Sequence, residues 1–168
     1  MGLLRTVFSN TRKPQGFWGK LMVAGMNGGS HAKMAFWGID LGSVPADGEI
    51  LDIGCGGGAN LARLMKRSSE ARVTGVDYSE VSAANYFWPD IENSFAEVRR
   101  VMVPGGKFLI VNEDDGLSGN NGKWEKIIDG MHTYTPDEVK GHLEAAGFKD
   151  IRIHRNEPKH WLAVTAIK

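Results

Sequence analysis

Apolar and polar positions along the middle of the chain alternate between two periodicities, which predicts helices and strands in turn. Short runs of apolar and β-branched residues, bounded by glycine or proline, indicate buried strands at 49–53, 72–77 and 107–112. Apolar residues at helical spacing predict helices at 17–26, 31–41, 59–68, 89–102 and 124–131.

The last third of the chain is the most sharply marked. Thr135, Pro136 and Glu138 form the pattern of a capping box at the start of a helix, and Gly147 is suited to end it. Two apolar runs then flank the turn residues 156–159, which predicts an antiparallel hairpin. The whole pattern predicts a three-layer α/β sandwich whose sheet is mostly parallel, with an antiparallel hairpin at its C-terminal edge.

A strand, a glycine turn and a helix follow one another in "LDIGCGGGAN", and the next strand ends in "VTGVD". Gly54 and Gly56 allow the backbone to turn and to approach a ligand closely, while the N–H groups at the helix start face that ligand. Asp77 stands at the carboxyl end of the second strand, where a carboxylate can accept hydrogen bonds from ribose hydroxyls. The order of these features predicts a site for a nucleoside-type cofactor, against the alternative of a tight turn without a ligand.

The same loop also satisfies the glycine pattern of nicotinamide and flavin dinucleotide sites at residues 54–59. Asp52 argues against that reading, because an acid beside the loop suits a cationic ligand better than a pyrophosphate. The "PGG" turn at 104–106, between a helix and a strand, is not a feature that a dinucleotide domain requires.

Three stretches, "EILDIGCGGGANLARL", "VTGVDYSE" and "FAEVRRVMVPGGKFLIVNE", resemble the motifs of class I S-adenosylmethionine-dependent methyltransferases. The resemblance covers about residues 45–168 and implies a Rossmann-like fold. The segment 1–44 is similar to the N-terminal helices of small-molecule members and would form a lid. One domain, 1–168, would therefore combine a lid (1–44) with a cofactor-binding core (45–168).

The resemblance also implies roles for single residues. Gly54, Cys55 and Gly56 would line the methionine part of S-adenosylmethionine, with Asp52 near its amino group, and Gly58 would also belong to the cofactor site. Asp77 would bind the ribose hydroxyls, and Tyr78 would pack beside the adenine. We expect no thiol chemistry from Cys55, and no catalytic base is assigned.

Candidates for substrate contact are fewer and less patterned. His31 and Trp37 lie on the predicted lid, although a tryptophan at helical spacing is also typical of a core. His132 and Tyr134 precede a helix near the expected pocket rim, where solvent exposure is an equal alternative for His132. The histidines show no ligand spacing, so no metal site is predicted, and "EDDG" at 113–116 is interpreted as a solvated acidic loop.

Composition narrows the function classes further. Lysines and arginines (20) balance aspartates and glutamates (20), so bulk charge indicates neither nucleic acid nor a membrane surface as partner. The single cysteine predicts a reducing compartment and hence a cytoplasmic protein. No apolar run approaches the ~20 residues of a membrane-spanning helix. A small-molecule substrate is the expected partner.

One stretch departs from the family pattern. Only residues 78–88 separate the ribose-binding acid from the later helix, whereas a helix, two strands and their loops need more than about 30 residues. The sheet is thus predicted to lack its third and fourth strands, with a seam near Ala83-Asn85. If the deletion is genuine, strand 49–53 would pair directly with strand 107–112. Exposed sheet or the run Tyr86-Phe87-Trp88 could then support a homodimer.

These observations predict an S-adenosylmethionine-dependent enzyme that methylates a small molecule. The alternative from another class is a non-catalytic binding or dimerisation module that retains the fold with a truncated core. An oxidoreductase that uses NAD is a distant third.

Overall fold

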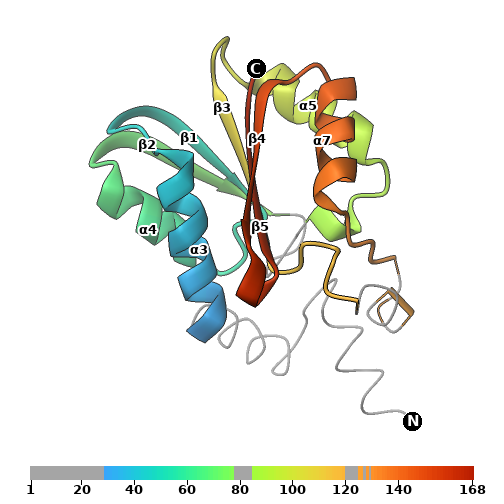
Figure 1. Cartoon of the computed structure of the whole chain (residues 1–168). Coiled ribbons are helices and arrows are strands. Elements are labelled where there is room, and N and C mark those ends of the chain that lie inside the picture. Colours follow the sequence, from blue (N-terminus) through green and yellow to red (C-terminus); the bar gives the residue numbers. More distant parts are fainter. Residues whose placement is uncertain (1–28, 78–84, 120–124, 127, 129) are drawn as a thin grey trace.

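A computed structural model describes residues 29–77, 85–119, 125–126, 128 and 130–168 (Figure 1). The helix expected at 17–26, the residue Tyr78 and residues 124, 127 and 129 of the helix expected at 124–131 lie outside the described residues. None of the helices in the described part is both long and apolar enough to cross a membrane.

The described elements follow the predicted order closely. They are α3 (Gly29–Gly42), β1 (Asp47–Ile53), α4 (Ala59–Arg67), β2 (Glu70–Val76), η1 (Asn85–Phe87), α5 (Ile91–Val101), β3 (Lys107–Asn112), α7 (Pro136–Ala145), β4 (Lys149–Asn156), η2 (Glu157–Lys159) and β5 (Trp161–Ile167).

The strands form two sheets rather than one. β1 and β2 pair in parallel, with Ile50 opposite Val73, while β3, β5 and β4 form an antiparallel sheet in that order. The C-terminal hairpin is confirmed. The prediction of a mostly parallel sheet is wrong for the described residues, because both ladders of β5 are antiparallel. β5 is the central strand of its sheet, which explains why its residues from Trp161 to Ala166 are all buried.

Direct pairing of β1 with β3, expected for a genuine deletion, does not occur among the described residues. The two sheets converge at the carboxyl end of β1, where Ile53 packs against the core of the other sheet, and they diverge toward the opposite end (Figure 1). The two described sheets therefore meet only near the carboxyl end of β1 (Figure 1).

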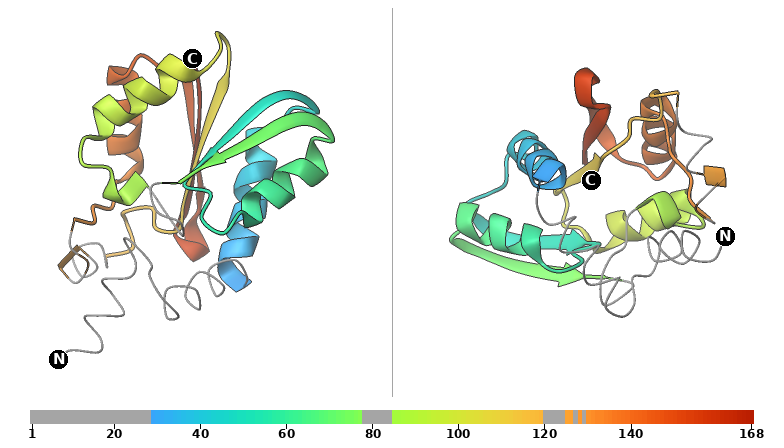
Figure 2. Two further views of the ribbon diagram at one scale, coloured as in Figure 1. Left: turned by 180° about the vertical axis from the view of Figure 1, so that it is seen from behind. Right: turned by 90° about the horizontal axis from the view of Figure 1, so that it is seen from below.

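The main core lies between the antiparallel sheet and helices α5 and α7. Phe95 of α5, Leu143 of α7 and Leu162 of β5 are completely buried in it. The predicted capping box is present at the start of α7, because Thr135 Oγ1 accepts from the N–H of Glu138 and Glu138 accepts from the N–H of Thr135. Helix α3 covers the other face of this sheet (Figure 2), which gives three layers.

The aromatic run at the seam is not an exposed patch. Tyr86 is only 6% exposed, and its hydroxyl accepts from the N–H of Asp114 at 3.1 Å. Trp88 packs edge-to-face on Phe95 with ring centroids 6.0 Å apart. Tyr86 is therefore unavailable for the expected dimer contact because the core buries it, whereas Trp88 is only partly buried and the homodimer stays a prediction.

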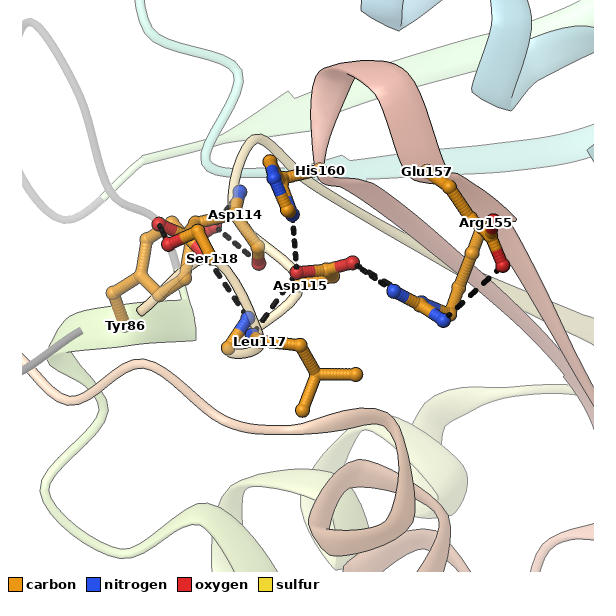
Figure 3. A network of polar contacts seen from close by, with 9 residues as sticks. Tyr86, Asp114, Asp115, Leu117, Ser118, Arg155, Glu157 and His160 are labelled. Carbon is orange, nitrogen blue, oxygen red and sulfur yellow. Dashed lines mark hydrogen bonds and ion pairs between the residues drawn. The ribbon is translucent and has the colours of Figure 1, made fainter. Parts of the chain in front are cut away.

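A buried carboxylate fastens the loop after β3 to the turn between β4 and β5 (Figure 3). Asp115 is completely buried; Arg155 Nε and Nη2 donate to its Oδ2 at 3.1 and 2.7 Å, and the N–H of Leu117 donates to its Oδ1 at 3.0 Å. His160 Nδ1 lies 3.3 Å from the same Oδ1. Burial alone would raise the pKa of Asp115, but these partners outweigh it and hold the pKa below its usual value. The interpretation of 113–116 as a solvated loop is thus wrong at Asp115.

Helix α3 lies close against β3 because two of its contact positions are glycines. A Cβ added to Gly38 would overlap the side chain of Val111, and one added to Gly42 would lie 2.9 Å from Leu109 Cδ2. The same helix also contacts β5 and α4, and α4 in turn packs on β2. α3 thereby connects the two sheets.

We expect Gly38→Ala to lower the free energy of unfolding by about 1–3 kcal/mol, because the added methyl group overlaps Val111. Alanine is intrinsically a better helix former than glycine by about 1 kcal/mol. A loss of stability in Gly38→Ala would therefore come from the packing against Val111 and not from helix propensity. Gly141 of α7 faces open space and provides the matched control. Urea denaturation of both variants checks the prediction, which fails if Gly38→Ala and Gly141→Ala change stability alike.

Candidate functional site

The glycine loop after β1 folds over the carboxyl end of β2. Gly54 and Gly56 have φ angles of 82° and 50°, a backbone region that favours glycine. The N–H of Gly54 donates to the carbonyl of Val76 at 2.8 Å, and the N–H of Gly58 donates to that of Cys55 at 2.8 Å. α4 then begins at Ala59. The sequence order strand, turn and helix is thus present as predicted.

Two carboxylates stand beside this loop. Asp77 directly follows β2, and its Oδ2 accepts from the N–H of Gly56 at 2.8 Å. Asp52 is half-buried at the end of β1, and its Oδ2 is a buried atom with no hydrogen-bond partner among the described residues. Burial, and then the negative charge of Asp77, raise the pKa of Asp52 above its ordinary value. A cation bound beside the loop would therefore offset the negative charge of the two carboxylates and lower the pKa of Asp52.

Cys55 lies within the loop but is not activated. Burial raises the pKa of its thiol, and the charges of Asp52 and Asp77 raise it further. Its Sγ packs against Gly75 of β2, where an added Cβ would lie 2.9 Å away. This environment favours a packing role and a protonated thiol.

A cavity of about 580 Å³ opens beside the loop, between the carboxyl ends of β1 and β2 and the helix α5. The two strands point toward α5 when the molecule is seen from below (Figure 2, right). Gly54 and Asp77 line one side, and Trp88, Asn93 and Glu97 line the other. Sequence reasoning missed the α5 residues, because Asn93 and Glu97 read as the solvated face of a helix and nothing in their spacing signals a cavity.

His31 and Trp37, the candidates from the N-terminal segment, lie on α3. His31 Nε2 is 2.6 Å from Glu113 Oε2, and His31 lines a second cavity of about 220 Å³. The Trp37 ring lies 6.0 Å from the ring of Trp161, centroid to centroid, and Trp37 is not part of that cavity's wall.

His132 and Tyr134 lie on the segment that leads into α7. The Tyr134 ring is buried and makes edge contacts to His132 and His142, with centroids 4.4 and 5.7 Å apart. Burial is the main cause that raises the pKa of Tyr134. His132 is exposed and lies 3.4 Å from a carboxylate oxygen of Glu125. Neither residue lines the two cavities, so the structure separates the two pairs of substrate candidates while it brings Gly54 and Asp77 together.

Comparisons with known proteins agree with this geometry. A family model described as a methyltransferase domain matches residues 50–87, which contain the second half of β1, the glycine loop, β2 and η1. A search of curated proteins found no significant match.

Solved structures resemble a larger part of the chain. Human N-acetylserotonin methyltransferase in complex with S-adenosylmethionine is 15% identical with a TM-score of 0.62, over 83% of this chain and 52% of that one. A candidate O-methyltransferase from Nostoc punctiforme is 11% identical with a TM-score of 0.70, over 99% and 66%. Phosphoethanolamine N-methyltransferase 2 from Haemonchus contortus, also with S-adenosylmethionine, is 15% identical with a TM-score of 0.66, over 81% and 52%.

The chain spans about half to two thirds of the length of these three proteins. Their identities of 11–15% concern the fold alone, whereas the domain match covers residues 50–87, among them Gly54 and Asp77 of the large cavity. The predicted resemblance is therefore confirmed at the level of architecture: this chain has the fold of class I S-adenosylmethionine-dependent methyltransferases.

Proposed function

We propose that this chain binds S-adenosylmethionine in the 580 Å³ cavity and transfers its methyl group to a small-molecule acceptor. The observation that carries the proposal is the position of Asp77. Asp77 lines the cavity at the carboxyl end of β2. It also lies beside the glycine loop, where its carboxylate accepts a hydrogen bond from the N–H of Gly56. This is the place where a nucleoside ligand binds an open α/β sheet.

The residues present fit the polar groups of this cofactor. Carboxylate oxygens of Asp77 can accept from ribose hydroxyls. Asp52 has a buried oxygen without a partner and a raised pKa, and a cationic amino group would satisfy that oxygen and lower the pKa. When bound, S-adenosylmethionine supplies an electrophilic methyl group on a sulfonium cation, and two neighbouring carboxylates suit a positively charged ligand.

The similar structures add support of a different kind. The human and the Haemonchus contortus proteins were both solved with S-adenosylmethionine, and each is named as a methyltransferase of a small molecule. For this chain, alignment of acceptor and methyl donor can supply much of the acceleration, so no base is assigned in the cofactor cavity. With a single cysteine, Cys55, we place the activity in the cytoplasm.

A second candidate function is ligand binding without turnover. The separation of the two sheets favours this function. Leu51 of β1 and Val76 of β2, on the two strands that end at the cavity, are each 46% exposed. A cavity with an incomplete wall would bind the cofactor but align it poorly. The exposed apolar positions would also suit contact with a second copy of the chain.

Calorimetric titration with S-adenosylhomocysteine tests the cofactor assignment. We expect micromolar binding and no comparable binding of NAD, and Asp77→Ala should weaken the affinity at least about tenfold, because hydrogen bonds to a charged group are lost. Glu70→Ala is the matched control, since Glu70 is an exposed carboxylate at the opposite end of the same strand. Preference for NAD, or equal affinities of the two variants, would contradict the proposal.

Asp52→Asn should have opposite effects on stability and binding. Because the folded state raises the pKa of Asp52, its ionised form destabilises the fold as the pH rises above the ordinary value of 3.8. The variant should therefore be more stable than the wild type at pH 7, with the difference vanishing below that value, and should bind S-adenosylhomocysteine more weakly.

Thermal denaturation across pH 3–8 and calorimetry measure these two effects. Asp47→Asn is the control, because Asp47 is exposed at the other end of β1 and should change neither quantity. A loss of stability at pH 7 in Asp52→Asn would show that the carboxylate has a structural partner instead.

A further inference from the structure

The second cavity, of about 220 Å³, is separate from the proposed cofactor site and shares no lining residue with it. Its wall combines the first two turns of α3, the residue after β3, the end of η2 and the start of β5. These parts contribute Ser30, His31, Met34, Glu113, Lys159 and Trp161. The volume is below the roughly 300–1,000 Å³ of pockets for drug-sized ligands, so it suits a small molecule.

The buried Asp115 network connects the loop after β3 to β4 and to the turn that precedes β5 (Figure 3). Glu113 precedes Asp115 by two residues on the loop after β3. Lys159 precedes His160, whose ring contacts Asp115, and Arg155 joins Asp115 to Glu157 of the same turn. The fully buried carboxylate thus restrains the two segments that carry Glu113 and Lys159, and both residues line the cavity.

The pairing of His31 with Glu113 sets the hydrogen-bonding character of one wall. Nε2 of His31 lies 2.6 Å from Glu113 Oε2, and a carboxylate can only accept, so Nε2 carries a proton. In the neutral ring the remaining nitrogen, Nδ1, is then an acceptor. A ligand group that donates a hydrogen bond, such as a hydroxyl, suits this wall.

Lys159 adds a positive charge to the wall of this cavity. Among the described residues no carboxylate oxygen forms an ion pair with its ammonium group, since Glu157 in the same turn pairs with Arg155. An ammonium group in a cavity wall is a recognition element for a carboxylate. The indole of Trp161 and the thioether of Met34 supply apolar and aromatic surface.

We propose that this cavity binds a small hydroxy acid, with its carboxylate at Lys159 and its hydroxyl at His31. This inference stands on the cavity itself and goes beyond the proposed function. A planar apolar spacer between the two polar groups would pack on the indole of Trp161. 4-Hydroxybenzoate is the simplest probe with these three features.

Calorimetry and NMR with three probes test the proposal in the full chain. 4-Hydroxybenzoate should bind with at least about tenfold higher affinity than phenol, which lacks the carboxylate, and than benzoate, which lacks the hydroxyl. Binding should shift the indole N–H signal of Trp161. Equal affinity of the three probes, no binding at 10 mM (on the order of a 3 kcal/mol interaction), or an unchanged Trp161 signal would overturn it.

Lys159→Met should abolish the preference for 4-hydroxybenzoate over phenol, whereas Lys149→Met, at the opposite end of β4, should preserve it. His31→Gln should abolish the preference over benzoate. Both cavity variants should bind S-adenosylhomocysteine with wild-type affinity, because neither residue lines the cofactor cavity. If the chain binds S-adenosylhomocysteine but not 4-hydroxybenzoate, this inference alone is overturned. If it binds 4-hydroxybenzoate but not S-adenosylhomocysteine, the proposed function alone is overturned.

Discussion

The close contact between α3 and β3 is the constraint on which the arrangement of this molecule depends. The two described sheets share no strand–strand ladder, so the position of β1 and β2 relative to the other sheet is set by side-chain packing and by α3. Gly38 and Gly42 allow that helix to approach Val111 and Leu109. The first turn of the same helix lines the small cavity. A displacement of α3 would therefore alter both the cofactor edge and the small cavity.

Two carboxylates show how the fold distinguishes scaffold from site. Asp115 is buried with a guanidinium, a backbone N–H and an imidazole as partners, and its pKa is lowered. Asp52 keeps a buried oxygen without a partner, and its pKa is raised. The first stabilises the fold through satisfied hydrogen bonds, whereas the second carries a destabilising charge, which is typical of a group placed for a ligand.

Local signals made much of the fold predictable. The capping box at Thr135, the left-handed glycine Gly147 and the strand–glycine–helix order near Gly54 depend on neighbouring residues, so the sequence alone identifies them. The carboxyl end of β2 likewise placed Asp77 at the loop. These features determine the elements and the loop that we propose as the cofactor site.

Long-range features were less accessible. The central position of β5 depends on which strand lies beside β3, 50 or so residues away in sequence, and the "EDDG" loop gave no sign that Arg155 and His160 would bury Asp115. The pattern around Asn93 and Glu97 predicts a solvent-facing helix surface. Their position across the cavity from the ends of β1 and β2 follows from the tertiary fold, which that pattern does not encode. The sequence shows that too few residues follow Asp77 for the expected helix and two strands. It does not show that the strands form two separate sheets instead of a direct β1–β3 pair.

A crystal structure of the chain with S-adenosylhomocysteine tests the central claim most directly. The account predicts that the ribose hydroxyl oxygens lie about 2.5–3.0 Å from the Asp77 carboxylate. It also predicts the ligand's amino group beside Asp52, in the cavity between the glycine loop and α5. A nucleoside bound elsewhere, or a saturated crystal in which this cavity holds no ligand, would contradict it.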